Sequence, residues 1–293
     1  MKAMILAAGE GTRLRPLTRD MPKPMLPLGG RPLIGHLVAL LREHGVRDIA
    51  VNLHHRPEAI PAYLGDGSSF GVRVTYSSEE TLLGSAGAVK KLASFFDDSF
   101  FILYGDVLTD IDLSALAARH RHCGASLTLA LHEADEPSRC GIAEVDGEGM
   151  IRRFREKPEP QEVFSTWANA GVYAAEPSIL RFIPEDSFFD FGSQLIPLLL
   201  EQGRLIGAYL SDSYFLDIGS FERYERAERD LARDAIRTPR PPPPMRTDGT
   251  RQFDGDNEDA ACTSAREDQF RRRRHGPGGV LRVVRRDGSQ RRN

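Results

Sequence analysis

The chain opens with a short apolar run, a glycine-rich turn and two basic residues, and this segment constrains the fold most. Residues 3–6 are predicted to form a buried strand, and Gly9 and Gly11 follow it closely. Glycines let the backbone turn and approach a ligand, and the amides of such a turn form an anion-binding concavity. Arg13 and Lys23 add positive charge along a path stiffened by prolines. The segment therefore predicts a phosphate-binding loop and points to nucleotide chemistry.

Two better-known glycine motifs are excluded at this position. A dinucleotide-binding fold needs Gly or Ala where this chain has Leu14, and a P-loop needs a Gly-Lys pair, which the sequence lacks. Lysine is scarce, with five residues against 34 arginines, yet Lys23 and Lys157 each directly precede a proline. Because the lysine ammonium is a compact point charge, it suits a phosphate whose geometry changes during reaction.

Apolar strands alternate with helical stretches up to about residue 232. Residues 48–53 are predicted to form a strand, and the fully apolar run at 100–104 is typical of a buried strand. The alternation predicts an α/β fold with a mostly parallel central sheet and helices on both faces. Strands at 142–145 and 150–154, joined by a glycine-containing turn, predict a hairpin that forms a small inserted lobe. Because ligands bind at the carboxyl ends of strands in such sheets, we expect the site at that edge.

Composition divides the chain into two parts. The strand–helix alternation predicts a folded domain over residues 1–235, whereas residues 236–293 begin with a proline-rich stretch. Residues 237–293 carry 14 arginines and eight acidic residues, with few apolar residues and no periodicity. We expect a disordered, solvated tail. A nucleic-acid-binding or membrane-binding arm is the less favoured interpretation, because aromatic residues are not interleaved with the basic ones.

The cysteines and the N-terminus bear on the cellular compartment. The sequence has three cysteines, an odd number, and they lie far apart: Cys123, Cys140 and Cys262. This pattern favours a reducing compartment and argues against a structural zinc site. The first apolar run is too short for a signal peptide. No stretch approaches the ~20 apolar residues of a membrane span. We therefore expect a cytoplasmic protein with no membrane partner.

Two aspartates stand where predicted strands emerge. Asp106 follows a fully apolar run and a glycine, and Asp217 follows an apolar tripeptide in a similarly open setting. Magnesium typically takes one or two protein carboxylates together with substrate phosphates. Asp106 and Asp217 are therefore the preferred metal pair. Asp110 and Asp112, which are nearer in sequence, remain alternative partners of Asp106.

The histidines are not expected to bind metal. His54 with His55, and His120 with His122, have no Cys or Glu at ligand spacing, so we expect surface or loop histidines. The chain also has neither a G-x-S-x-G elbow nor a Cys–His signature, so no covalent nucleophile is expected.

Taken together, these residues resemble the signature of sugar-1-phosphate nucleotidyltransferases. The likeness covers about residues 1–232 and rests on a set of motifs in the family's order: L-A-A-G-E-G-T-R, M-P-K-P, L-G-S-A-G, Gly105-Asp106, Glu156-Lys157-Pro158, Asn169-Ala170-Gly171 and Asp217-Ile218-Gly219. The closest likeness is to mannose-1-phosphate guanylyltransferase-like members. The family implies a Rossmann-like nucleotidyltransferase fold that uses Mg²⁺. Many members carry a left-handed β-helix, but this chain has no hexapeptide repeat, so we expect neither that domain nor acetyltransferase activity.

The resemblance also implies roles for individual residues. Those that bind nucleotide are Leu6, Ala7, Ala8, Gly9, Gly11, Thr12, Glu79 and Gly84. Arg13 and Lys23 are the catalytic residues, the first on the triphosphate and the second at the α-phosphate, and Asp106 and Asp217 hold Mg²⁺. The residues that bind the sugar phosphate and its hydroxyls are Lys157, Glu156, Asn169 and the Gly141 backbone.

The implied reaction needs no general base. An oxygen of the sugar 1-phosphate attacks the α-phosphorus of a nucleoside triphosphate and displaces pyrophosphate. A phosphate monoester has a second pKa of about 6, so it is already largely dianionic at neutral pH. Catalysis then reduces to alignment and charge neutralisation.

Glu79 bears on the choice of base, because thymidylyl relatives have a glutamine at the matching place. A carboxylate can accept from the two donors of guanine, N1–H and N2–H₂. GTP with mannose 1-phosphate is therefore preferred, and the alternative is UTP or dTTP with another sugar 1-phosphate. A catalytically silent, nucleotide-sugar-binding regulatory subunit is a further alternative. No nucleic-acid partner is expected, and a homo-oligomer remains open.

Overall fold

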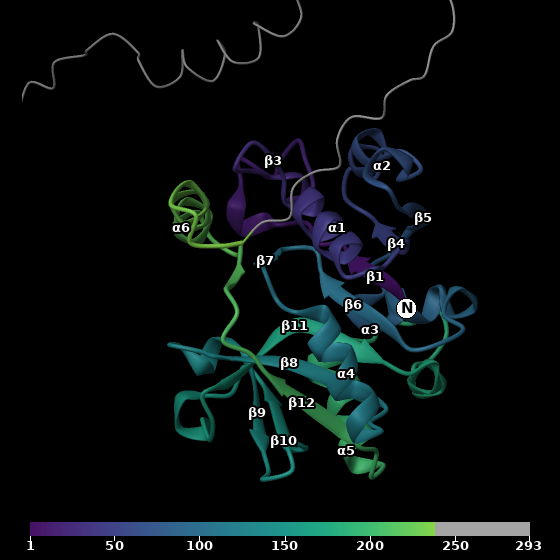
Figure 1. Ribbon diagram of the computed structural model, residues 1–293, viewed down its shortest axis with the longest axis vertical. Coiled ribbons are helices and arrows are strands. Elements are labelled where there is room, and N and C mark those ends of the chain that lie inside the picture. The colour runs from purple at the N-terminus through teal and green to yellow at the C-terminus, as the bar shows by residue number, and fades with distance from the viewer. Residues whose placement is uncertain (238–293) are drawn as a thin grey trace, which may run out of the picture. The chain divides into compact units, whose positions relative to one another are not determined.

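A mixed sheet forms the centre of the protein, whose structure, a computed structural model, describes residues 1–237 (Figure 1). Within these residues the sheet has nine strands. Its parallel part runs in the order β5 (Arg73–Ser78), β4 (Asp48–Leu53), β1 (Lys2–Leu6) and β6 (Phe100–Tyr104). Beside β6, β11 (Trp167–Ala175) runs antiparallel, and it pairs in turn with β8 (Leu127–Glu133). The last strand on that branch, β12 (Ile206–Leu210), is parallel to β8.

The predicted hairpin joins this sheet through β11. Its strands are β9 (Gly141–Val145) and β10 (Ile151–Glu156), and β9 pairs with the first half of β11. The inserted lobe is therefore continuous with the central sheet, and it holds the start of β9 and the end of β10 close to β11.

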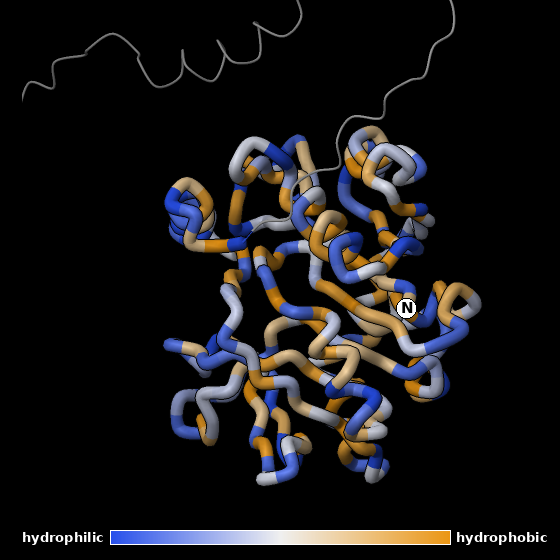
Figure 2. Tube along the Cα trace, viewed as in Figure 1, coloured by the Kyte–Doolittle hydropathy of each residue, from blue (hydrophilic) through white to orange (hydrophobic). Residues whose placement is uncertain are grey.

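Helices cover both faces of the sheet, as predicted. On one face lie α1 (Leu33–Glu43), α2 (Ala59–Leu64) and α4 (Leu113–Cys123), and on the other lie α3 (Gly84–Lys91) and α5 (Ile196–Glu201). Alternation along β1 shows why both faces need cover, because Ala3 and Ile5 pack on the first side and Met4 on the second. Figure 2 shows hydrophobic residues along the central strands. The predicted α/β fold is confirmed.

A third, smaller apolar cluster joins the two ends of the described chain. The N-terminal loop contributes the small hairpin β2 (Pro27–Leu28) and β3 (Arg31–Pro32), and the C-terminal part contributes β13 (Phe215–Asp217) and α6 (Phe221–Ala232). Buried leucines from the loop pack against Ile218 and Ala227. This cluster positions β13, which pairs antiparallel with β7 (Val107–Thr109) directly after β6.

The folded unit extends slightly past the predicted boundary at residue 235. Ile236 packs into the third cluster, and the backbone N–H of Arg237 donates to Asp110 Oδ2 (3.2 Å). The remainder of the predicted tail, residues 238–293, lies outside the described residues. Within residues 1–237, no helix is both long enough and apolar enough to cross a membrane.

Candidate active site

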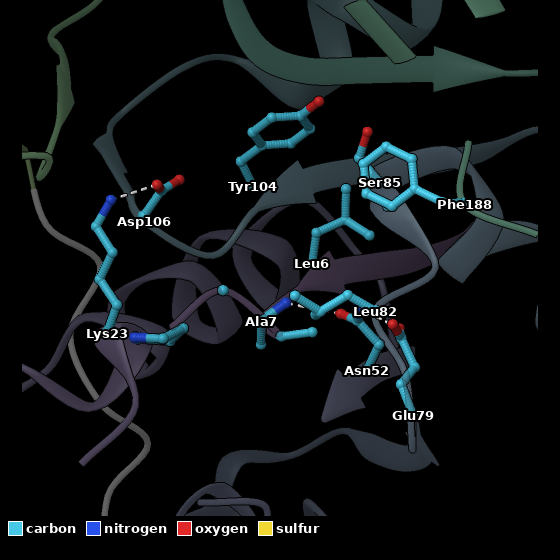
Figure 3. Close-up of a pocket in the computed structure, with 14 residues that line it drawn as sticks. Leu6, Ala7, Lys23, Asn52, Glu79, Leu82, Ser85, Tyr104, Asp106 and Phe188 are labelled. Atoms are coloured by element: carbon cyan, nitrogen blue, oxygen red, sulfur yellow. Dashed lines mark hydrogen bonds and ion pairs between the residues drawn. The ribbon is translucent and has the colours of Figure 1, made fainter. Parts of the chain in front are cut away.

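A cavity of about 230 Å³ opens at the carboxyl ends of β1, β4 and β6, where the fold class predicts a ligand. Most of the residues predicted to handle nucleotide line it: Leu6, Ala7, Ala8, Gly9, Lys23, Glu79, Gly84 and Asp106. Six further residues line the cavity that were not predicted as site residues: Pro24, Asn52, Leu82, Ser85, Tyr104 and Phe188. Figure 3 shows Lys23 and Asp106 at one side of the view and Glu79, Leu82 and Phe188 at the other.

Lys23 joins the two aspartates predicted as a metal pair. Its buried ammonium donates to Asp106 and lies 3.4 Å from Asp217 Oδ1. The pairing of β7 with β13 brings the carboxylates together, because Asp217 lies opposite Val107, the neighbour of Asp106. On the other side of Asp217, Arg223 Nη1 lies 3.1 Å from Oδ2. Arg223 was not predicted, although it lies only six residues after Asp217, in the first turn of α6 (Phe221–Ala232), and this short spacing is the signal that could have identified it.

The two alternative metal partners have structural roles instead. Asp110 accepts hydrogen bonds from the backbone N–H groups of Tyr214 (2.8 Å) and Arg237 (3.2 Å). Asp112 is the N-cap of α4 and accepts from Ala115 N (2.9 Å). Of the aspartates considered from the sequence, Asp106 and Asp217 are therefore the two that converge.

The donor set at this point suits a cation shared with a substrate. No group of three or more His, Cys, Asp and Glu with metal-binding geometry occurs in residues 1–237. Two carboxylates nevertheless converge on one positive group, the Lys23 ammonium. Magnesium is commonly held by one or two carboxylates, with phosphates and water completing its shell. The residues present therefore fit magnesium bound together with a triphosphate.

Asn52 fixes the glycine-rich loop to Glu79. Its Oδ1 accepts from Ala7 N (2.7 Å), so its Nδ2 faces Glu79 Oε1 and donates to it (2.7 Å). The other Glu79 oxygen accepts from Leu83 N (3.0 Å), and His54 Nδ1 donates to the Glu79 carbonyl (2.8 Å). Asn52 and Glu79 are both buried. A polar Asn inside the apolar run of β4 was the one sequence signal that could have identified this residue.

The rest of the glycine-rich loop lies beside the cavity rather than on its wall. Gly11 has a positive φ of 63°, and Thr18 Oγ1 donates to its carbonyl (2.7 Å). Thr12 and Arg13 are exposed, and Arg13 makes no ion pair or hydrogen bond within residues 1–237. Gly11, Thr12 and Arg13 therefore do not line the cavity, although Gly9 of the same loop does.

Gly84 has a packing role that explains the L-G-S-A-G motif. Its φ is +73°, and a Cβ there would lie 2.6 Å from the Phe189 carbonyl oxygen. That oxygen accepts from the N–H groups of Ala86 and Gly87 (2.9 Å each), and Phe189 N donates to Leu83 O (2.8 Å). The motif therefore seats the segment around Phe189 directly on the first turn of α3.

The residues predicted to bind the sugar phosphate gather at the start of β9 and the end of β10. Glu156 lies opposite Gly141 in the strand register, and a Cβ on Gly141 would lie 2.5 Å from Glu156 Oε2. Lys157 Nζ lies 3.7 Å from Glu156 Oε1, and the lysine side chain is 70% exposed. Burial raises the pKa of Glu156 above its usual range, against the opposing effect of Lys157.

Asn169 connects this second group of residues to the cavity. Its Nδ2 donates to Tyr173 Oη (2.7 Å), and its Oδ1 accepts from Gly171 N (3.0 Å). The Tyr173 ring meets the ring of Tyr104, a cavity residue, at a centroid distance of 5.9 Å. The nucleotide-side and sugar-side residues are thus adjoining sets at one edge of the sheet.

The histidine prediction is wrong for His120. This side chain is 1% exposed on α4, where Nδ1 lies 2.8 Å from Thr128 Oγ1 and Nε2 lies 3.1 Å from Glu176 Oε1. Burial lowers its pKa, although the Glu176 carboxylate opposes the shift. His120 is a core residue whose two polar partners belong to other elements, Thr128 to β8 and Glu176 to the segment after β11.

Comparison with known sequences shows which protein family this chain resembles. Residues 2–234 match the family model described as "Nucleotidyl transferase". The chain is 40% identical to the UTP–glucose-1-phosphate uridylyltransferase of Synechocystis and 34% identical to the mannose-1-phosphate guanylyltransferase of Mycobacterium tuberculosis. These alignments cover 79% and 81% of this chain, and 63% and 66% of the two relatives. The chain thus spans about two thirds of their length.

Solved structures give the same result for the fold. HddC from Yersinia pseudotuberculosis, complexed with GMP-PN, matches with a TM-score of 0.67 at 26% sequence identity. The match covers 78% of this chain and 99% of HddC. The Rossmann-like fold expected from the motifs is confirmed.

Proposed function

Because this chain belongs to the nucleotidyl transferase family, as its motifs indicate, we propose that it transfers a nucleotidyl group from a nucleoside triphosphate to a sugar 1-phosphate. The observation that supports this most directly is the convergence of Lys23, Asp106 and Asp217 at one end of the cavity. Such a cluster can stabilise the negative charge that builds up on a phosphate during transfer. The cavity beside it accommodates the rest of the nucleotide.

The chemistry requires alignment rather than proton abstraction. An oxygen of the sugar phosphate forms a bond to the α-phosphorus, and the bond from that phosphorus to the β-phosphate oxygen breaks. Pyrophosphate leaves with the electron pair. Because the attacking phosphate is already dianionic at neutral pH, the site needs to hold two polyanions in line and offset their repulsion.

Each basic residue has a place in that alignment. Lys23, held by Asp106 and Asp217, stabilises charge at the α-phosphate, while Arg13 and the loop amides from Gly9 onward hold the β- and γ-phosphates. Lys157 binds the attacking phosphate from the opposite side. Glu156, Asn169 and the Gly141 backbone lie in reach of sugar hydroxyls on that side, as the position of β9, β10 and β11 favours.

Asp106 and Asp217 would hold Mg²⁺ when the triphosphate is bound. When bound, the ion supplies charge neutralisation on the α-phosphate and fixes the orientation of the phosphate chain. Within the protein, Lys23 contacts one oxygen of each carboxylate and Arg223 contacts the other oxygen of Asp217, so the two basic groups hold the carboxylates in position.

We propose GTP and mannose 1-phosphate as the substrates. Glu79 lines the cavity, and each of its oxygens already accepts one hydrogen bond. A carboxylate oxygen has two lone pairs, so one acceptor position per oxygen remains for the N1–H and N2–H₂ of guanine. The similarity to a mannose-1-phosphate guanylyltransferase and the GMP-PN complex of HddC favour the same nucleotide.

UTP with glucose 1-phosphate is the second candidate. It is favoured by the 40% identity to the Synechocystis uridylyltransferase, a higher value than the 34% of the guanylyltransferase relative.

A pyrophosphate-release screen tests the activity and the choice of substrates together. ATP, CTP, GTP, UTP and dTTP are each combined with Mg²⁺ and with mannose 1-phosphate or glucose 1-phosphate. The proposal predicts the highest kcat/KM for GTP with mannose 1-phosphate. Faster turnover of UTP or dTTP would reject the guanine assignment, whereas nucleotide binding without pyrophosphate release in any combination would identify a silent regulatory member.

A further inference from the structure

Phe188 is unusual because its large apolar side chain is exposed at the rim of the cavity. It is 60% exposed, and Leu82, another lining residue, is 40% exposed. Single exposed hydrophobic residues are common and need no explanation by themselves. Two exposed apolar side chains on the wall of one cavity are less common, and their exposure calls for a physical explanation.

The backbone around Phe188 is held firmly, so its exposure is not the result of a loose loop. Phe189 exchanges hydrogen bonds with Leu83, Ala86 and Gly87, as described above, at 2.8–2.9 Å. Gly87 leaves no space between α3 and this segment, since a Cβ there would lie 2.7 Å from the Ser187 carbonyl oxygen. The main chain is therefore fixed on both sides of Phe188, and its ring is presented at the rim.

The hydrophobic core lies close to Phe188 along the chain, yet its ring is not buried there. Phe191, three residues on, is fully buried in the core beside Tyr173, with ring centroids 5.1 Å apart. Phe188 stays outside that core and faces the cavity region, near Ser85 in the close-up view (Figure 3). An apolar ring kept out of the core and at a binding cavity indicates a contact with ligand.

The cavity carries charged groups at one end and, at the other, two exposed apolar side chains beside the buried Glu79. Lys23 and Asp106 lie at the charged end, and Leu82 and Phe188 lie at the far side of the view (Figure 3). A nucleoside triphosphate has the same asymmetry, with phosphates at one end and a flat aromatic base at the other. With the phosphates at Lys23, the base reaches the end that carries Glu79, Leu82 and Phe188.

We propose that Phe188 is a nucleobase-stacking residue that closes the end of the cavity opposite Lys23 over the base. The inference rests on the proposed function for the identity of the ligand as a nucleoside triphosphate. Stacking on an aromatic ring tolerates any base, because every base has a π-face. Phe188 therefore sets how tightly nucleotide binds, while hydrogen bonds at the Glu79 end set which base is preferred.

Equilibrium binding of GTP and UTP, measured by calorimetry without sugar phosphate, is the direct test. Phe188→Ala is expected to weaken the binding of both nucleotides by about tenfold, with the ratio of their affinities unchanged. Phe188→Trp, which keeps an aromatic face, is expected to bind both within about threefold of the wild-type protein. In turnover, Phe188→Ala raises the KM of the nucleotide and leaves the KM of the sugar 1-phosphate unchanged.

Phe221→Ala is the matched control, because Phe221 is 41% exposed on α6 and does not line the cavity. It is expected to bind both nucleotides as the wild-type protein does. Unchanged affinity in Phe188→Ala, or a loss equal to that of Phe221→Ala, overturns the inference.

Binding and turnover separate this inference from the proposed function. A wild-type protein that binds nucleotide but releases no pyrophosphate disproves the activity, and the binding comparison still decides the role of Phe188. A wild-type protein that binds neither nucleotide overturns both.

Discussion

The cavity-lining groups on the nucleotide side and the predicted phosphate-binding lysine on the sugar side differ in how far their side chains are already fixed. Asn52 and Glu79 are buried and joined to the glycine-rich loop by hydrogen bonds of 2.7–3.0 Å. Lys23 is likewise buried between two carboxylates. On the sugar side, Lys157 is 70% exposed and lies 3.7 Å from Glu156, beyond hydrogen-bond distance.

This difference predicts that the two sides affect different kinetic constants. A preorganised group costs little to arrange when the substrate arrives, so its interactions are available for the transition state. An exposed lysine has to be ordered by the phosphate that it binds. Substitutions on the nucleotide side near Lys23 should therefore lower kcat, and substitutions on the sugar side should mainly raise the KM of the sugar 1-phosphate.

The largest effect is expected at the converging carboxylates. Asp106→Asn and Asp217→Asn should each lower kcat by about 10³-fold, because each removes charge that holds Lys23 and the metal in place. Pyrophosphate release gives the rate, and thermal unfolding shows that the fold is kept. Asp112→Asn is the control, since Asn also caps a helix, and it should keep wild-type turnover. Rates within tenfold of wild type for both site variants would contradict the assignment.

The second-largest effect is expected at Lys157, where the KM values of the two substrates should respond differently. Lys157→Ala should raise the KM of the sugar 1-phosphate by about 10- to 100-fold, because a hydrogen bond to a charged group is lost. The KM of the nucleotide should not change. Lys91→Ala, which removes an exposed lysine bound to the Ser78 carbonyl, is expected to change neither value. A rise in the nucleotide KM equal to that of the sugar phosphate would show that Lys157 serves both substrates.

Two glycine-to-alanine substitutions test how rigid the backbone packing is on the nucleotide side and on the sugar side. Gly84→Ala combines a positive φ with a clash against the Phe189 backbone, so urea unfolding should show a loss of about 2 kcal/mol. A Cβ at Gly141 has no positive φ to strain it and would meet the side-chain ends of Glu156 (2.5 Å) and Phe154 (2.6 Å) instead of backbone. Gly141→Ala should cost less stability than Gly84→Ala but raise the KM of the sugar 1-phosphate. Equal losses of stability would remove the distinction between a rigid side and an adaptable side.

The smallest effect concerns pH and the hairpin that follows Lys23. His36 is buried, donates from Nε2 to the Leu28 carbonyl (2.9 Å), and accepts at Nδ1 from Arg31. Burial lowers its pKa to about 4, below the usual value of about 6.5. The neutral form is thus favoured in the folded state, and its contribution is complete above pH 6.5 and is lost as the pH falls towards 4.

Urea unfolding at pH 7 and pH 5.5 measures this contribution. Stability should fall by about 1 kcal/mol between these values on account of His36. His36→Gln should show a correspondingly smaller decline, whereas His122→Gln, a change at an exposed position on α4, should keep the wild-type decline. The same decline in His36→Gln and wild type would exclude His36 as the cause.

Local sequence was sufficient for those parts of the site that depend on strand ends and tight turns. Gly9 and Lys23 follow β1, and Asp106 follows β6, so the fold class alone brings them to one edge. Asp217 was separable from Asp110 and Asp112 only by its open setting, and the pairing of β13 with β7 is the reason it reaches Asp106.

Residues that act through distant contacts could not be predicted in this way. Asn52 bonds to Ala7 across 45 positions, and Phe188 is placed by hydrogen bonds to a helix some 100 positions earlier in the chain. His120 was predicted to be exposed because its partners, Thr128 and Glu176, belong to other elements. Hydrophobic periodicity reports which face of an element is buried, but it carries no information about which distant polar group will lie opposite.

The role proposed for Lys23, Asp106 and Asp217 is to promote attack at the α-phosphorus. Nucleoside triphosphate labelled separately at the α- and γ-phosphates, incubated with sugar 1-phosphate and Mg²⁺, tests it directly. We expect the α-label to enter a nucleotide sugar and the γ-label to enter pyrophosphate in equal amounts, and both products to form about 10³-fold more slowly with Asp106→Asn. Release of the γ-label as inorganic phosphate, or an α-label that stays in nucleoside mono- or diphosphate, would contradict it.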